Sequence, residues 1–154
     1  MLLNGVNHVA ILTNDTERLH AFYRDVFDAT VFHDQKEGEG VRLSFVEIGG
    51  NAMLNIFEVV GNTEAERQTP MFGRGRIDHI GLEAASQEAF DTIRGRLIAC
   101  GATDGFVTDF GAAISVFFRD PDGLEGEVLL HNPAARSEDM KPPGTPAAGY
   151  EPVS

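Results

Sequence analysis

The chain has 154 residues, 42% of them hydrophobic, which is typical of one globular domain with a substantial core. Its formal net charge of -12, from 24 acidic and 12 basic residues, disfavours nucleic acid as a partner because phosphate backbones would be repelled. No apolar run approaches the roughly 20 residues of a bilayer span, so we expect a soluble, cytoplasmic protein without membrane contact. The single cysteine, Cys100, excludes an intrachain disulfide and a thiolate cluster, so a metal would need nitrogen and oxygen ligands.

The first predicted unit spans residues 5–60 and begins with a strand. VNHVAIL (6–12) alternates with a two-residue period, which places His8 on the face opposite its apolar neighbours. The segment after it carries apolar residues at helical spacing and predicts an amphipathic helix capped by Asn14 or Asp15. Three further strands are predicted near residues 29–33, 41–48 and 52–60.

The second predicted unit spans residues 76–131 and follows the same order. IDHIGLE (77–83) places His79 at the same point of the same apolar pattern. A helix follows, which Ser86 can cap and Gly101 can end. Its later strands are predicted near residues 106–110, 112–118 and 126–131.

The two units form an internal repeat. The histidines lie 79 - 8 = 71 residues apart, and the same offset lays RLSFVEI over AISVFFR, while one extra residue lays Asn55 over Glu127. We therefore expect an α+β fold of two βαβββ units that form a curved mixed sheet around a central cavity. A single domain, 1–131, would include the polar connector 61–75, and the proline-rich tail 132–154 would be flexible or wrapped along a neighbour.

The repeat predicts a metal site. If approximate two-fold symmetry relates the units, their equivalent strands bring four polar side chains into one concavity. The imidazoles of His8 and His79 and the carboxylate of Glu127 suit one divalent ion, such as Fe(II), Mn(II), Ni(II), Co(II) or Zn(II). Asn55 would be a weak fourth ligand or would bond to a ligated water. The alternative for each histidine alone is an ordinary hydrogen-bonded strand residue, but the matching positions favour the metal.

Three stretches resemble the vicinal oxygen chelate superfamily in order and spacing: NHVAILTNDTERLHAFYRDVF, DHIGLE and FFRDPDGLEGEV. This superfamily includes glyoxalase I, methylmalonyl-CoA epimerase, extradiol dioxygenases, fosfomycin-resistance thiol transferases and bleomycin-resistance proteins. The resemblance runs from about Gly5 to His131 and implies a homodimer, since members commonly pair units between chains. The chain departs from the pattern at Asn55, where glyoxalase-like and epimerase-like members carry glutamate or glutamine. The ligand positions that the resemblance implies are His8, Asn55, His79 and Glu127.

Departures from the family patterns rank the chemistries. Members resembling extradiol dioxygenases carry a tyrosine where this chain has Phe117 and a histidine where it has residues 108–110, so Fe(II)-dependent ring cleavage ranks second. Fosfomycin-resistance enzymes place a threonine where this chain has Ala10, so that activity ranks third. The resemblance then favours a metal-dependent lyase or isomerase that binds a small substrate through adjacent oxygens and transfers a proton through an enolate.

Proton transfer needs a base. KEGEGVRLSF resembles the epimerase segment that carries a catalytic glutamate, which indicates Glu39 or Glu37, and Glu125 shares a strand face with Glu127. The alternative for these candidate bases is a solvated surface carboxylate. Arg42 is expected to point into the concavity and bind a substrate carboxylate or phosphate, or else to form a surface salt bridge.

A non-catalytic protein that sequesters a drug is the alternative from another class. Bleomycin-resistance proteins resemble this fold, are acidic and generally lack the metal ligands, so the charge of -12 suits them. The two histidines and Glu127 oppose that alternative, because a carboxylate buried against two imidazoles is costly without an ion or strong hydrogen bonds.

Overall fold

The computed structural model divides into two compact units. Unit 1 comprises Met1–Gln68 with Pro121–Gly123, and unit 2 comprises Thr69–Asp120 with Leu124–Ser154. The predicted connector 61–75 and the end of the predicted tail lie partly outside the described residues. Those residues are 2, 4–65, 67, 69, 72, 73 and 75–151, with only the backbone described for Glu37.

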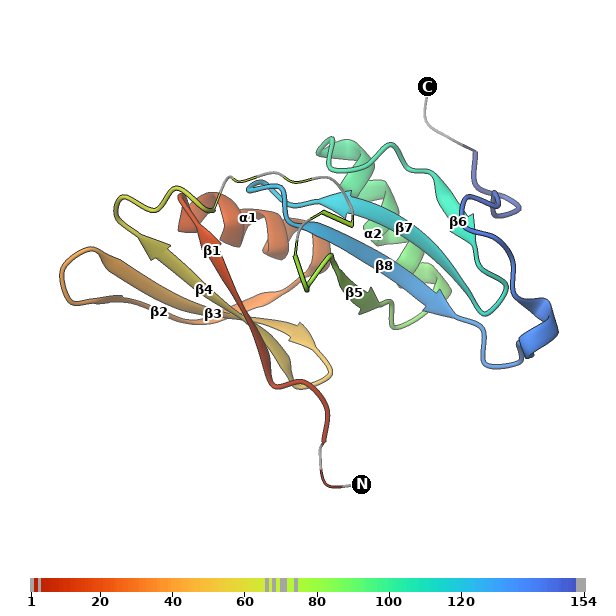
Figure 1. The fold of residues 1–154 in the computed structure, drawn as a ribbon, viewed down its shortest axis with the longest axis horizontal. Coiled ribbons are helices and arrows are strands. Elements are labelled where there is room, and N and C mark those ends of the chain that lie inside the picture. The colour runs from red at the N-terminus through yellow and green to blue at the C-terminus, as the bar shows by residue number, and fades with distance from the viewer. Residues whose placement is uncertain are drawn as a thin grey trace. The chain divides into compact units, whose positions relative to one another are not determined.

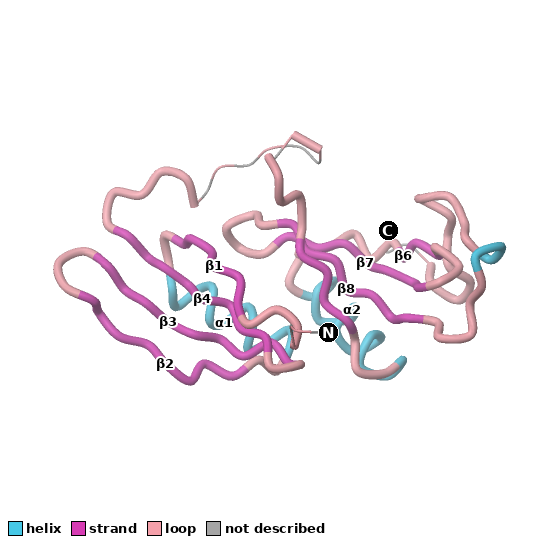
Figure 2. Tube along the Cα trace, turned by 60° about the horizontal axis from the view of Figure 1, so that its bottom comes forward, coloured by secondary structure: helices cyan, strands magenta, loops and turns pink. Residues whose placement is uncertain are grey.

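Unit 1 is a βαβββ unit, as predicted. Its strands hydrogen-bond in the order β1-β4-β3-β2, with β1 parallel to β4 and the other neighbours antiparallel (Figure 1). Helix α1 lies along one face of this sheet (Figure 2). The elements are β1 (His8–Thr13), α1 (Thr16–Phe27), β2 (Thr30–Glu37), β3 (Val41–Gly49) and β4 (Ala52–Val59).

Helix α1 begins and ends where its sequence dictates. Of the two predicted caps, Asp15 is the one used, since its side chain accepts a hydrogen bond from the Arg18 N–H. Asp28 ends the helix in the left-handed conformation, with φ at 55°. Between these ends the predicted apolar stripe faces the sheet and forms the core of unit 1, which includes Leu19, Tyr23, Val26, Val46, Leu54 and Ile56.

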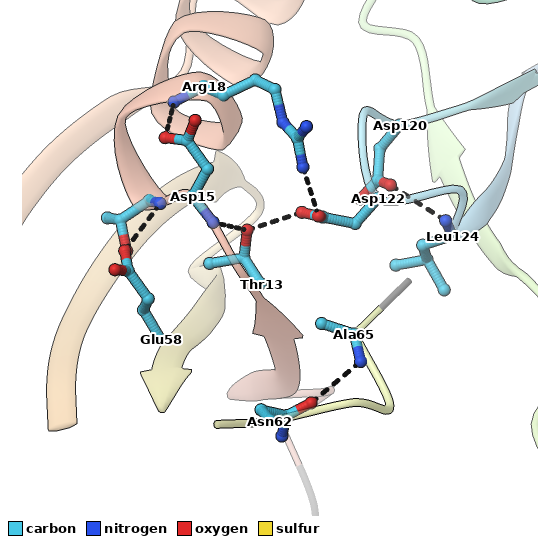
Figure 3. Close-up of polar contacts among 10 residues, drawn as sticks. Thr13, Asp15, Arg18, Glu58, Asn62, Ala65, Asp120, Asp122 and Leu124 are labelled. Carbon is cyan, nitrogen blue, oxygen red and sulfur yellow. Dashed lines mark hydrogen bonds and ion pairs between the residues drawn. The ribbon is translucent and has the colours of Figure 1, made fainter. Parts of the chain in front are cut away.

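The turn Pro121–Gly123 contributes a buried carboxylate to unit 1 (Figure 3). The Thr13 hydroxyl donates to Asp122 Oδ2 at 2.6 Å, and Arg18 Nη2 donates to Asp122 Oδ1, also at 2.6 Å. Thr13 is fully buried and Asp122 is 5% exposed. The end of β1 and the first turn of α1 are therefore hydrogen-bonded to a residue more than a hundred positions away along the chain.

Unit 2 repeats this topology, with strand order β5-β8-β7-β6 and β5 parallel to β8. The Ser86 side chain accepts from the Ala89 N–H and caps α2, and Gly101 follows the helix with φ at 74°. Both ends agree with the prediction. The core of unit 2 includes Phe90, Leu97, Val107, Val116, Phe118 and Val128. The elements are β5 (Ile80–Glu83), α2 (Gln87–Ala99), β6 (Val107–Asp109), β7 (Ala113–Arg119) and β8 (Glu125–His131).

The described part of the tail packs against its own unit, which corrects the expectation of a flexible segment. The Asp109 N–H donates to Thr145 O at 2.7 Å and the Ala147 N–H donates to Val107 O at 2.9 Å, which extends the edge at β6. Further on, the Tyr150 hydroxyl donates to Asp91 of α2 at 2.6 Å. These backbone bonds do not depend on periodic apolar residues, so the sequence pattern gave no sign of them.

Candidate metal centre

Unit 1 places His8 and Asn55 on the open face of its sheet. The parallel register pairs His8 with Met53 and Ala10 with Asn55, so the histidine lies diagonally across from the amide. His8 and Ala10 are exposed, whereas Ile11 turns toward the helix-covered face. The alternation therefore runs as predicted, and we name His8 and Asn55 half-site 1.

Unit 2 places His79 and Glu127 in the equivalent positions. Here Gly81 pairs with Glu127, as Ala10 pairs with Asn55 in unit 1. His79 Nε2 lies 3.5 Å from Glu127 Oε2, and their side chains are 31% and 13% exposed. We name His79 and Glu127 half-site 2. A β-carbon at Gly81 would lie 3.5 Å from Leu129 Cδ2 and 3.9 Å from Glu127 Oε2, which are ordinary contact distances, so Gly81 lies directly against the Glu127 side chain.

Each histidine ring is held by the residue just before it. His8 Nδ1 lies 2.8 Å from Asn7 Oδ1, and His79 Nδ1 lies 3.0 Å from Asp78 Oδ1. With Nδ1 as the donor in these bonds, the lone pair of a neutral ring is on Nε2. In half-site 2 this is the nitrogen that faces Glu127.

The chemistry of the two half-sites fits a divalent ion. Imidazole nitrogen, carboxylate and amide oxygen are ligands of first-row divalent metals. The 3.5 Å between His79 and Glu127 exceeds a charge-assisted hydrogen bond and is close to the roughly 3.4 Å between two ligands bound at about 2.1 Å in a tetrahedral site. Asn55 Oδ1 is buried and has no hydrogen-bond partner in the described part of the chain, so it retains a lone pair for a cation or a ligated water. Within the described residues of either unit, no cluster of three or more histidine, cysteine, aspartate and glutamate side chains forms a complete site.

Glu125 lies beside half-site 2, as predicted. It is two residues before Glu127 on the same face of β8, at a spacing of about 7 Å, and it is only 8% exposed. Arg119, its partner in the register of β7, approaches it with Nε at 3.5 Å from Oε2. Glu125 is therefore a buried carboxylate on the same face of β8 as Glu127.

The structure places Arg42 on the helix-covered face of unit 1, where the predicted orientation toward the concavity was wrong. Its guanidinium donates to Asp34 of β2 and to Glu17 of α1, both at 2.6 Å. These bonds hold the pKa of Asp34 below its ordinary value and raise that of Arg42. The alternative that the sequence allowed, a salt bridge, is the one observed.

A one-residue difference in register explains the error with Arg42. Phe45 pairs with Asn55 in unit 1, and Phe117 pairs with Glu127 in unit 2, so β3 and β7 match with an offset of 72. The sequence comparison used 71 for these strands. Because side chains alternate, a shift of one residue moves every side chain to the other face.

Glu39 lies far from half-site 1 within unit 1. It is exposed at the tip of the turn between β2 and β3. Phe45 pairs with Asn55, and Val41, at the start of β3, is four residues away, or about 13 Å. Glu39 lies beyond Val41, so unit 1 does not bring this candidate base to Asn55. The side chain of the other candidate in this loop, Glu37, lies outside the described residues.

Phe117 and three polar residues lie next to the residues of the half-sites. The Phe117 ring lies edge-on to the His79 imidazole, with centroids 5.6 Å apart, where extradiol-type members are expected to carry a tyrosine. Sequence reasoning missed Asn7, Asp78 and Arg119. The repeated pairs NH and DH, at the offset of 71, were the signal for the first two.

None of the described helices is long and apolar enough to cross a membrane. A comparison with curated proteins finds no match. Among solved structures, the chain resembles a glyoxylase/bleomycin resistance protein/dioxygenase domain from Frankia sp. EAN1pec, with 22% identity over 86% of this chain and 95% of that one, and a TM-score of 0.70.

Two other solved structures share the fold. The fosfomycin resistance protein FosX from Listeria monocytogenes, complexed with Mn(II) and sulfate, is 20% identical over 88% of this chain and 98% of its own, with a TM-score of 0.65. Lactoylglutathione lyase from Agrobacterium tumefaciens is 22% identical over 84% of this chain and 96% of its own, with a TM-score of 0.58. A family model matches residues 5–128, and the chain thus belongs to the Glyoxalase/Bleomycin resistance protein/Dioxygenase superfamily.

Proposed function

We propose that this protein is a divalent-metal-dependent enzyme that transfers a proton next to a carbonyl of a small substrate bound through adjacent oxygens. His8, His79 and Glu127 would hold the ion, and Asn55 would be a fourth ligand or would bond to a ligated water. The observation that carries the proposal is the equivalence of the two half-sites, each with a histidine diagonally across from an oxygen donor. The buried, unpartnered oxygen of Asn55 supports it.

The residues around half-site 2 have separate roles in this proposal. A bound divalent ion would supply Lewis-acid stabilisation of the negative charge that develops on the substrate oxygens. Glu125 would accept the substrate proton at a carboxylate oxygen, and Arg119 would hold that carboxylate in place or bind an acidic group of the substrate. Phe117 would exclude water from one side of His79.

Two observations favour proton transfer over ring cleavage and support a metal. The ring against His79 is phenylalanine, so it has no hydroxyl to move a proton during oxygen chemistry. A FosX structure from Listeria monocytogenes is described as a complex with Mn(II) and 1S,2S-dihydroxypropylphosphonic acid, which is consistent with Mn(II) as one candidate ion here. Each ion would be bound by half-site 1 and half-site 2 together, and these would come from one chain or from the two chains of the proposed homodimer.

The first experiment is metal analysis of protein purified without a histidine tag. We expect about one divalent ion per chain, lost in His79→Ala and retained in His131→Ala, a control that removes an exposed histidine at the end of β8. Sedimentation of the same samples would report whether the chain is a dimer. Full occupancy in a His8→Ala, His79→Ala double variant would refute the assignment of the ligands.

The second experiment measures the reaction. Protein loaded in turn with Fe(II), Mn(II), Co(II), Ni(II) and Zn(II) would be tested for deuterium exchange alpha to the carbonyl in 2-oxoaldehyde hemithioacetals and acyl thioesters. We expect exchange to depend on the metal and to fall by about 100-fold or more in Glu125→Gln with the ion still bound. Oxygen uptake with catechols and Fe(II) would instead indicate a dioxygenase, and tight ligand binding without turnover would indicate a sequestering protein.

A further inference from the structure

The residues that precede the two proposed ligand histidines differ in charge. Asn7 contacts His8 through Oδ1, and Asp78 contacts His79 through Oδ1, in equivalent geometry. The oxygen donors across from the two rings differ in the same way, since half-site 1 has Asn55 and half-site 2 has Glu127. Half-site 1 is therefore built from two neutral amides, whereas half-site 2 has two carboxylates.

Asp78 is fixed more firmly than a surface carboxylate. Its Oδ1 accepts from His79 Nδ1 at 3.0 Å, and its Oδ2 accepts from the Phe72 N–H at 2.6 Å. The Asp78 side chain is 23% exposed. Both carboxylate oxygens of Asp78 thus accept hydrogen bonds within unit 2. The carboxylate is therefore held in position before a metal ion binds His79.

A carboxylate at this position determines the tautomer of the ring. An ionised carboxylate only accepts hydrogen bonds, so His79 Nδ1 must carry the proton and Nε2 must present its lone pair. A carboxylate partner also makes the imidazole a better electron donor than an amide partner does. The amide of Asn7 can orient His8 in the same way, but without the charge.

We infer that Asp78 and Asn7 are positioning residues for the metal ligands, and that the charge of Asp78 makes half-site 2 the stronger anchor for a cation. This inference rests on the proposed function, because it assigns unequal parts to the two half-sites of the same metal site. Asp78 acts through His79 and does not itself contact the ion. Removing Asp78 should therefore weaken metal binding more than removing Asn7.

The first test needs no metal. The ¹⁵N resonances of the histidine rings in the metal-free protein, recorded at mildly alkaline pH, distinguish the two neutral tautomers. We expect His79 in the Nδ1–H form, a shift toward the Nε2–H form in Asp78→Ala, and retention of the Nδ1–H form in Asp78→Asn, which keeps an acceptor oxygen. An unchanged tautomer in Asp78→Ala would overturn the positioning role.

The second test measures affinity by competition of Co(II) and Zn(II) with a chromophoric chelator. Asp78→Ala should weaken binding by about 10- to 100-fold, and Asp78→Asn should weaken it less. Asn7→Asp, which gives half-site 1 the partner found in half-site 2, should tighten binding by up to about tenfold. Asp25→Ala is the control, because it removes an exposed carboxylate of α1 that pairs with the neighbouring Arg24.

The two tests separate this inference from the proposed function. If the wild-type protein binds no divalent ion, the proposed function fails, while the tautomer measurement still reports whether Asp78 orients His79. If the ion binds but Asp78→Ala keeps its affinity and the visible spectrum of its Co(II) complex, the inference fails and the proposed function stands. Circular dichroism of each variant confirms that it is folded, and Asp78→Asn and Asn7→Asp provide the comparison if Asp78→Ala does not fold.

Discussion

Replacing Asp122 by alanine should destabilise unit 1 substantially. In the folded protein Asp122 accepts hydrogen bonds from the buried Thr13 hydroxyl and from Arg18, both at 2.6 Å (Figure 3). A hydrogen bond to a charged group contributes about 1.5–3 kcal/mol. The substitution also leaves the proton of the buried Thr13 hydroxyl without this acceptor, although the hydroxyl oxygen still accepts from the Asp15 N–H. The Arg18 side chain is 43% exposed, so its ion pair adds no more than about 1 kcal/mol.

Together these contributions predict a loss of about 2–4 kcal/mol for Asp122→Ala, or roughly 4–16 °C in Tm for a chain of this size. Asp122→Asn keeps an acceptor oxygen and should lose about half as much. The assay is urea unfolding in a Tyr150→Phe background, where Tyr23 is the remaining tyrosine and its fluorescence reports on the core of unit 1. Tyr23 is fully buried there, so its emission should change as unit 1 unfolds.

The control for this prediction is Asp25→Ala. Asp25 pairs with Arg24 on the surface of α1, where both side chains are more than 60% exposed, so its loss should change the free energy of unfolding far less than Asp122→Ala does. If Asp122→Ala destabilises the protein by less than about 1 kcal/mol, or by no more than Asp25→Ala, then the buried carboxylate does not stabilise the turn as argued.

Three further predictions concern the remaining structure. Burial lowers the pKa of His20 below its ordinary value in the folded protein. The stability that neutral His20 contributes is therefore present above about pH 6.5 and is lost as the pH falls toward the lower folded pKa. The urea midpoint should decrease when the pH is lowered from about 7.5 to 5.5, and it should decrease less in His20→Asn. A β-carbon in Gly126→Ala would lie 2.2 Å from the Phe118 ring, so the variant should lose about 1–3 kcal/mol in thermal unfolding. Tyr150→Ala should free the tail from α2 and speed tryptic cleavage after Arg136, whereas unchanged cleavage would show that Tyr150 does not hold the tail.

The sequence predicted the repeated unit because its signals are local. Alternation in the first strand of each unit, the helical stripes and the capping residues Asp15 and Ser86 each depend on a few neighbouring positions. The same signals placed His8 and His79 correctly on the open faces of their sheets. Equivalent positions in the two units then followed from the offset of 71 at the first strands.

Features that depend on long-range pairing were not predictable in this way. The offset changes by one residue before β7, and no pattern within β3 or β7 marks that point. The orientation of Arg42 depended on this register and was therefore wrong. The docking of the tail at β6 likewise uses backbone hydrogen bonds, such as that from Ala147 to Val107, which any non-proline residue can make.

The differences between the half-sites are more informative than their likeness. Duplication accounts for two histidines at equivalent positions. It does not account for the carboxylates of Asp78 and Glu127 beside the two nitrogens of His79, because the equivalent residues of unit 1 are the amides Asn7 and Asn55. Burying Glu127 beside an imidazole whose other nitrogen already has a carboxylate partner is costly unless a positive charge lies between them. In half-site 1 the corresponding cost is that of one buried, unpartnered amide oxygen, Asn55 Oδ1, which is smaller than that of a buried charge, so half-site 2 gains most from a bound cation. We therefore predict that metal binding begins at half-site 2.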